Sequence, residues 1–279
     1  MNISFELRHM LARVRKRTPS ILRLNNFSTL QRIVNEPISL SRFGDGELRY
    51  CLKKKSLEFQ QWVPDLSCRL ERALLRPTQN LLQCFNHAFE GSDTVRWVIP
   101  LQRSDKEYIR VESLLREGDI GVLRRDRQRK LYIECWRIIE SQTQVLTYGE
   151  ATVFFLGLYL DEYASGRIEE VKCLFRQMFY RKRILFVCPS TPLMGESFVR
   201  LEPQMRRFGL ISAQFIEAPS VNAFGVMERV TEQICRSRGF DEIFIQAGPV
   251  ASVLAAELTE KLNVRILDVG SLNTAIPYL

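Results

Sequence analysis

Histidine is almost absent from this chain, with only His9 and His87 among 279 residues. Two histidines supply too few groups for a histidine-based triad or a multi-histidine metal site, so carboxylates are the more suitable metal ligands. The seven cysteines are odd in number, and none of them is spaced as C-x-x-C. This pattern argues against a disulfide framework or a zinc site and is typical of the reducing cytoplasm.

Long hydrophobic runs are also missing. The longest apolar run, residues 151–160, is interrupted by Thr152 and is far shorter than the roughly 20 residues that span a bilayer. The first residues contain no apolar stretch with a small-residue cleavage site, so we expect no signal peptide and a cytoplasmic location. Neither G-x-G-x-x-G nor G-x-x-x-x-G-K-[ST] occurs, which counts against NAD binding and P-loop chemistry.

Acidic residues are outnumbered: 32 Asp and Glu stand against 40 Lys and Arg, a formal net charge of +8. Such a chain favours anionic partners, whether nucleic acid, a membrane surface or phosphorylated substrates. Residues 1–17 combine five basic residues with apolar residues at helical spacing. We therefore expect residues 1–26 to form a basic amphipathic helix that contacts an anionic membrane from its inner face. The alternative is a surface helix whose apolar stripe packs on the core.

Two further basic runs, residues 124–130 and 181–183, are typical of solvated faces. They lack the interleaved aromatic residues on which nucleic-acid bases stack, so we expect no nucleic-acid partner.

The rest of the chain is globular, since hydrophobic residues make up 46% and charged residues 26%. In the second half, apolar runs predict strands that alternate with helical stretches. The predicted strands are 183–188, 212–216, 242–246 and 264–267, and the predicted helices are 195–208, 222–238 and 249–262. This alternation predicts an α/β fold with a Rossmann-like parallel sheet covered by helices on both faces.

The pattern of the first half also predicts an α/β fold. Its predicted helices are 27–35, 64–76, 104–115, 125–140 and 150–163, and its predicted strands are 38–43, 95–100 and 144–147. Residues 164–166 are a candidate joint, so we expect one domain over residues 27–279, with an N-terminal half to about residue 165 and a nucleotide-binding C-terminal half, 166–279.

An apolar strand runs into the segment at residues 41–48, S-R-F-G-D-G-E-L. Gly44 and Gly46 bracket Asp45, so the backbone there can approach a ligand closely. Asp45 and Glu47 can aim two carboxylates at one point, and two hard oxygens leave a divalent ion positions for water and phosphate. The segment therefore predicts Mg²⁺ or Mn²⁺ bound together with a nucleotide diphosphate.

Arg42 adds a planar fork that suits a phosphate or carboxylate partner. The alternative interpretation of this segment is an ordinary β-to-α turn, in which Asp45 caps the helix and Arg42 forms a surface ion pair.

Polar residues and glycines follow each predicted strand of the second half, at 189–192, 217–224, 247–249 and 268–270. Ligands of parallel sheets bind beyond these carboxyl ends. Gly248 lets the backbone pass close to a ligand, and the helix that follows it would offer amides to a phosphate. The alternative for each loop is plain turn chemistry, with Asn222 as a helix cap.

The segment at 41–48 resembles the signature of the bacterial GT-D glycosyltransferases, first described as a domain of unknown function whose D-x-E motif holds a metal and a nucleotide sugar. Residues 218–224 (A-P-S-V-N-A-F), 246–255 (Q-A-G-P-V-A-S-V-L-A) and 266–270 (I-L-D-V-G) resemble further segments of that family in the same order. Three positions depart from the pattern. Ser271 and Asn273 stand where the family commonly has His and Asp, and Tyr148 stands where it commonly has Arg.

The resemblance implies a metal-dependent glycosyltransferase, a hexosyltransferase that moves a sugar from a nucleotide-diphospho-sugar donor to a glycan, glycolipid or glycoprotein acceptor in bacterial surface-glycan synthesis. A UDP-sugar is the expected donor, and Mn²⁺ or Mg²⁺ is the expected cofactor. The implied catalytic residues are Asp45, Glu47 and Arg42, of which Asp45 and Glu47 hold the metal. The implied nucleotide-binding residues are Arg42, Phe43, Gly44, Ser190, Ser220, Asn222, Gly248, Pro249 and Asp268.

The sequence leaves the catalytic base open among Glu150, Asp105 and Asp161, and it leaves the sugar, the acceptor, the stereochemistry and the oligomeric state open as well. Two other functions remain as alternatives. One is a metal-dependent phosphohydrolase or nucleotidyl enzyme that uses the same carboxylates. The other is a non-catalytic nucleic-acid binder, suggested by the pI of about 9.2.

Overall fold

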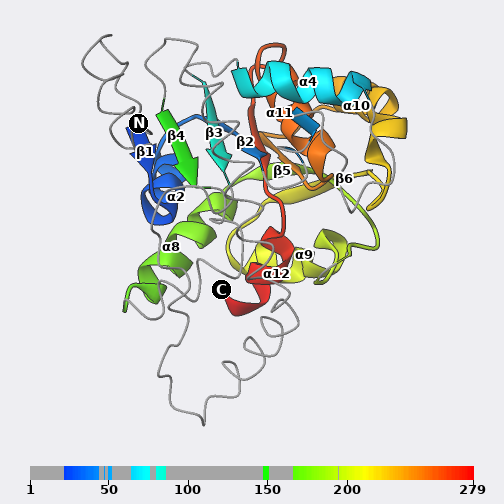
Figure 1. The fold of residues 1–279 in the computed structure, drawn as a ribbon. Helices are drawn as coiled ribbons and strands as arrows, with labels where there is room; N and C mark the ends of the chain where they lie inside the picture. The colour runs from blue at the N-terminus through cyan, green and yellow to red at the C-terminus, as the bar shows by residue number, and fades with distance from the viewer. Residues whose placement is uncertain are drawn as a thin grey trace, which may run out of the picture.

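The computed structural model describes residues 22–43, 47, 50–51, 64–75, 80–85, 147–150, 166–193 and 195–279. Within these residues, eight strands form one sheet in the order β1-β4-β3-β2-β8-β7-β5-β6, and every neighbouring pair is parallel (Figure 1). The strands are β1 (Leu22–Leu24), β2 (Ser39–Phe43), β3 (Leu81–Phe85), β4 (Thr147–Glu150), β5 (Arg183–Cys188), β6 (Ser212–Glu217), β7 (Glu242–Ile245) and β8 (Arg265–Asp268).

Helices cover both faces of this sheet. The α-helices are α2 (Asn26–Asn35), α4 (Pro64–Leu75), α8 (Ile168–Phe179), α9 (Phe198–Arg207), α10 (Met227–Arg236), α11 (Pro249–Thr259) and α12 (Leu272–Ala275). Helices α4, α10 and α11 share one buried apolar cluster, and α2, α8, α9 and α12 share the other (Figure 1). Successive strand residues alternate between the clusters: Leu185 and Val187 point to the first, Ile184 and Phe186 to the second. The predicted α/β fold with a doubly covered parallel sheet is confirmed.

The predicted strands of the second half agree with β5 to β8 to within one residue, and α9, α10 and α11 lie inside the predicted helical stretches. In the first half, α2 and α4 also agree with prediction. The strand predicted at 144–147 overlaps β4 at Thr147; β4 continues to Glu150, and residues 144–146 lie outside the described residues. Glu150 therefore ends a strand and does not begin a helix.

Two strands and two α-helices were not predicted, β1, β3, α8 and α12, nor was the short 3-10 helix at Ile276–Tyr278. Strand β3 was hidden by Gln83, a polar residue that is nevertheless fully buried and donates a hydrogen bond to the Ala73 carbonyl of α4. The strand predicted at 95–100, the helices at 104–115 and 125–140, and most of the helix at 150–163 lie outside the described residues. Residues 1–21 of the helix expected over residues 1–26 lie outside them as well, whereas Leu22–Leu24 form strand β1 and are not helical.

The two halves of the chain meet at the pair β2 and β8, where Leu40 lies opposite Leu267. Helix α11 packs across this junction, and Ser41 Oγ donates to the Ser252 carbonyl at 3.2 Å. The chain on either side of residues 164–166 therefore contributes to one sheet. No helix among the described residues is both long and apolar enough to cross a membrane.

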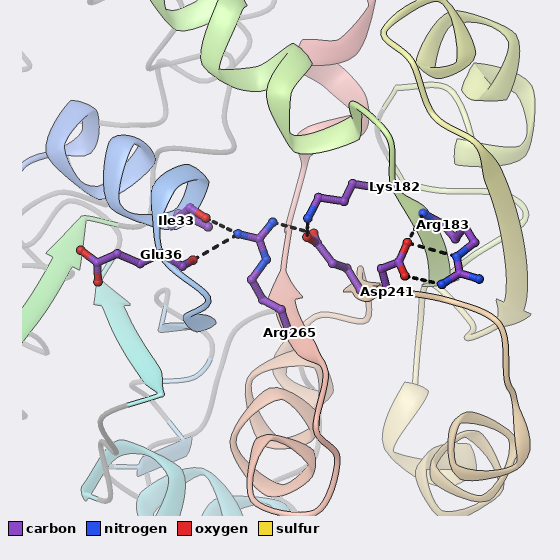
Figure 2. A network of polar contacts seen from close by, with 7 residues as sticks. Ile33, Glu36, Lys182, Arg183, Asp241 and Arg265 are labelled. Atoms are coloured by element: carbon purple, nitrogen blue, oxygen red, sulfur yellow. Dashed lines mark hydrogen bonds and ion pairs between the residues drawn. The ribbon is translucent and has the colours of Figure 1, made fainter.

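A buried ionic network joins the elements at the edge where the strands begin (Figure 2). Glu242 is 3% exposed and accepts from Lys182 Nζ at 2.7 Å and from Arg265 Nη2 at 2.6 Å. Arg265 also donates to the backbone carbonyls of Ile33 and Glu36, at the end of α2. The network ties α2 to β7 and β8 on the edge opposite the carboxyl ends.

Candidate functional site

At the carboxyl ends of the strands, here called the carboxyl edge, the chain leaves neighbouring strands toward opposite faces of the sheet. After β2, Tyr50 and Cys51 join the apolar cluster of α4, α10 and α11, whereas β8 leads into α12 on the other face. The same divergence separates β7, which leads to α11, from β5, which leads to α9. Such points of divergence are where ligands bind in open parallel sheets.

Arg42 and Asp268 form the buried centre of this edge. They are 7% and 5% exposed, and Arg42 Nη1 lies 3.9 Å from Asp268 Oδ1. Ser252 Oγ lies 3.2 Å from Asp268 Oδ2, and the Gly270 amide donates to Asp268 Oδ1 at 3.2 Å. Burial raises the pKa of Asp268 above its usual value, although the Arg42 charge and the hydrogen bonds act in the opposite direction. Asp268 is thus engaged by the protein on both oxygens.

Ser252 was missed by the sequence analysis. Its hydroxyl donates to the Arg42 carbonyl as well as lying within reach of Asp268, so α11 fixes both the strand end and the carboxylate. The available signal was a single polar side chain within the apolar run V-A-S-V-L-A-A of α11. Phe43 has its side chain in the apolar cluster, so it contributes packing there.

The proposed metal ligands follow directly after β2. Glu47 is helical and half-buried, and Asp45 lies outside the described residues, together with Gly44 and Gly46. Across the part of the chain that the structure describes, no three His, Cys, Asp or Glu side chains gather into a metal-binding group. A donor set of two carboxylates fits an oxygen-preferring ion such as Mg²⁺ or Mn²⁺, which keeps several positions for water and phosphate oxygens.

The loops after β5 and β6 touch each other. Both Glu217 oxygens accept from the Ser190 amide, at 3.1 and 2.9 Å, and Ser190 Oγ donates to one of them at 3.2 Å. Ser220 Oγ donates to the Thr191 carbonyl. The structure thus brings Ser190 and Ser220 together and adds an exposed carboxylate, Glu217, to which the sequence analysis gave no role.

Asn222 does not act as a helix cap. It is exposed, has left-handed backbone angles (φ 56°), and its side chain makes no capping hydrogen bond to the 3-10 turn that follows. The cap alternative is therefore wrong, and the amide group remains at the rim of the loop.

Gly248 is exposed with φ 53°, and an added Cβ would meet nothing within 4 Å, so a ligand has room to approach its backbone. The helix start beyond it offers fewer amides than an ordinary N-terminus. Pro249 has no N–H, and the Ala251 amide donates to the Gly248 carbonyl at 2.9 Å.

Asn273, one of the positions that depart from the family pattern, is fully buried. Its Nδ2 donates to the Glu196 carbonyl at 2.9 Å, and its Oδ1 accepts from Gln246 Nε2 at 2.8 Å. Asn273 therefore joins α12 to the loop after β5 and to the end of β7. Ser271 lies just before α12, and Tyr148 lies in β4, two strands away from β2.

The candidate residues form two groups along one edge. Arg42 and Asp268 belong to β2 and β8, and Glu47 follows β2 in the chain, while Ser190, Ser220 and Asn222 belong to the loops after β5 and β6. Strands β2 and β5 are three spacings apart, about 14 Å. Gly248 lies between the groups, so the edge suits one elongated ligand. Of the candidate bases, Glu150 ends β4, whereas Asp105 and Asp161 lie outside the described residues.

Comparison with known proteins agrees with this fold. No family model matches the chain. A curated relative, the probable glycosyl transferase Gly of Streptococcus gordonii, is 24% identical over 267 residues, which are 95% of this chain and 33% of that protein. The chain thus spans about a third of the length of this relative.

Two solved structures are similar along nearly the whole chain. One shows the domain of unknown function 1792, described as having a distinct glycosyltransferase fold: TM-score 0.66, 20% identity, covering 94% of this chain and 82% of that one. The other is described as a new glycosyltransferase with this domain from Streptococcus sanguinis: TM-score 0.61, 20% identity, covering 93% and 84%. The expected similarity to these glycosyltransferases is confirmed, and the fold is theirs.

Proposed function

We propose that this chain, which has the fold of the 1792-domain glycosyltransferases, is itself a metal-dependent glycosyltransferase that uses a nucleotide-diphospho-sugar, with a UDP-sugar as the donor. The observation that carries the proposal is the position of the D-x-E segment. It directly follows β2 in the sequence, and β2 ends at the carboxyl edge where Arg42 is held against Asp268. The acceptor that fits the family resemblance is a glycan, glycolipid or glycoprotein of the bacterial surface.

The chemistry requires that negative charge developing on the leaving diphosphate be neutralised. A Mn²⁺ or Mg²⁺ ion held by Asp45 and Glu47 would supply Lewis-acid stabilisation of that charge. Arg42 would share it through two parallel N–H donors, which suit the geometry of phosphate oxygens. Because Arg42 is buried against the sheet, its guanidinium is already oriented before the donor binds.

The nucleoside end of the donor would lie over β7, β5 and β6. Gly248 allows the ligand to approach the backbone, while Ser190, Ser220 and Asn222 line the neighbouring loops. The hydroxyls of Ser190 and Ser220 already donate within the loops, so their remaining capacity is to accept a hydrogen bond from the ligand.

The charge pattern disfavours a nucleic-acid binder. Among the described residues, the exposed arginines Arg200, Arg206 and Arg236 each pair with a glutamate four positions earlier on the same helix or its approach. The charges of these three arginines are compensated locally, so they add little to a basic surface on α9 and α10. A peripheral contact with an anionic membrane would come instead from residues 1–17, whose basic and apolar residues carry that proposal.

The first test is a thermal-shift panel of nucleotides with and without Mn²⁺. Ligands that bind only the folded state raise the melting temperature, and we expect UDP and UDP-sugars to do so only with the metal. UDP binding of equal strength without metal, measured by calorimetry, would count against the site.

The second test replaces the two carboxylates. We expect Asp45→Ala and Glu47→Ala each to reduce sugar transfer by at least about 100-fold, the size seen when a charge-stabilising group is removed. The circular dichroism spectrum should not change. The matched control is Glu232→Ala, an exposed carboxylate of α10. If Asp45→Ala and Glu47→Ala both transferred sugar at nearly the wild-type rate, the D-x-E segment would be an ordinary turn. Phosphate release without any acceptor would favour the phosphohydrolase.

A further inference from the structure

Gly270 lies directly against the guanidinium group of Arg42. A Cβ added to Gly270 would fall 1.1 Å from Arg42 Nη1, 2.3 Å from Cζ and 2.8 Å from Nη2. Those three atoms therefore fill the space that any side chain at position 270 would occupy. The backbone of Gly270 has φ 45°, a conformation that glycine adopts without a steric cost.

The opposing charge for this guanidinium comes from the same short segment. Along β2, Arg42 points to the same face as Leu40, into the apolar cluster of α2, α8, α9 and α12. Asp268, which ends β8 and lies against Ser252 of α11, supplies the opposing charge, and the Gly270 amide in turn donates to Asp268 Oδ1 at 3.2 Å. The segment D-V-G at 268–270 therefore provides both a charge partner and a surface for Arg42.

We propose that Gly270 is a positioning residue whose missing side chain creates the seat that holds the Arg42 guanidinium at the carboxyl edge. The seat is built by the C-terminal half of the chain, whereas Arg42 and the carboxylates at 45 and 47 belong to the N-terminal half. The inference rests on the proposed function in one respect, namely that the seated Arg42 meets the diphosphate of the donor.

The variant Gly270→Ala tests the seat. The obstructed atoms are the far end of a flexible side chain, so the chain can fold with Arg42 displaced. We expect the dissociation constant for UDP with Mn²⁺, measured by calorimetry, to rise at least about tenfold, the effect of losing one charge-assisted hydrogen bond. The matched control is Gly166→Ala. Gly166 also has a positive φ, 77°, but nothing lies within 4 Å of its added Cβ, so UDP affinity should not change.

A double-mutant cycle with Arg42→Ala separates the seat from ordinary backbone strain. We expect Gly270→Ala to weaken UDP binding little further once Arg42 is absent, because there is no guanidinium left to displace. The proposal would be overturned if Gly270→Ala weakened UDP binding by the same factor with and without Arg42. It would also be overturned if Gly270→Ala bound UDP as tightly as the wild type.

The same cycle on urea unfolding needs no ligand. Gly270→Ala should lower stability more in the wild type than in Arg42→Ala, and if the single variant fails to fold, the double variant should fold. If Gly270→Ala lowered the free energy of unfolding equally in the wild type and in Arg42→Ala, the proposed seat would be refuted. If the two substitutions were coupled in unfolding but the wild-type protein did not bind UDP, the seat would be supported and the proposed donor refuted.

Discussion

Two carboxylates, Glu242 and Asp268, are buried at opposite ends of the strands, and their surroundings differ. Glu242, where the strands begin, contacts two cations at 2.6 and 2.7 Å. Asp268, where the strands end, faces one guanidinium at 3.9 Å, and burial dominates the shift of its pKa. At the residue scale, Glu242 thus closes a structural network, whereas Asp268 holds a residue of the candidate site.

We expect Glu242→Ala to lower the free energy of unfolding by about 3–5 kcal/mol, because it leaves the buried Arg265 charge without its partner. Urea denaturation followed by circular dichroism measures this loss. The control is Glu232→Ala, which removes an exposed ion pair and should cost less than about 1 kcal/mol. A loss of similar size in both variants would contradict a structural role for the buried network.

At the element scale, α12 is held in place by Asn273 and not by an apolar face alone. The side-chain amide donates to the Glu196 carbonyl and accepts from Gln246. The loop after β5 also closes on this residue, since a Cβ at Gly195 would fall 2.9 Å from Asn273 Nδ2. The position of the β5 loop therefore depends on a donor at residue 273.

We expect Asn273→Asp to destabilise the protein by roughly 1–3 kcal/mol at neutral pH, because a carboxylate cannot donate to the Glu196 carbonyl and would be buried. Chemical denaturation gives the value. Asn263→Asp makes the same substitution at an exposed residue and should change stability little. If Asn273→Asp were as stable as the wild type, the amide would not be needed at this place.

At the scale of the whole molecule, the described sheet begins at Leu22, after the basic residues 1–17. Removing residues 1–17 therefore deletes no residue of a described strand. Each basic residue near an anionic surface is worth roughly 1 kcal/mol, so these residues would supply most of any membrane affinity.

We expect the protein without residues 1–17 to bind anionic vesicles more weakly than the full chain, with equal turnover on a short soluble acceptor. Liposome co-sedimentation at low and high salt measures the difference, and neutral vesicles are the control, because screening weakens the interaction. Equal sedimentation of both proteins would refute the membrane contact. If the shortened chain unfolded, the expected N-terminal helix would instead pack on the core.

The sequence by itself determined the α/β class, the strands β5 to β8 and the identity of the carboxylate motif. These features are local: apolar runs such as residues 183–188 mark strands, and the residues flanking Asp45 are adjacent in the chain. Neither kind of pattern requires knowledge of what lies beside it in space. Where the pattern was broken, as by Gln83 in β3, the strand was missed.

Only the tertiary structure decided which residues support the motif. Gly270 and Ser252 are more than 200 positions from Arg42 in the chain, yet they contact it because β2 pairs with β8 and α11 crosses their junction. Strand order is set by packing and hydrogen bonding between distant segments, and no local periodicity records it. For the same reason the sequence could propose Asn222 as a cap, whereas the structure leaves its side-chain amide without a capping bond. The burial of Asp268 against Arg42 was likewise visible only in the structure.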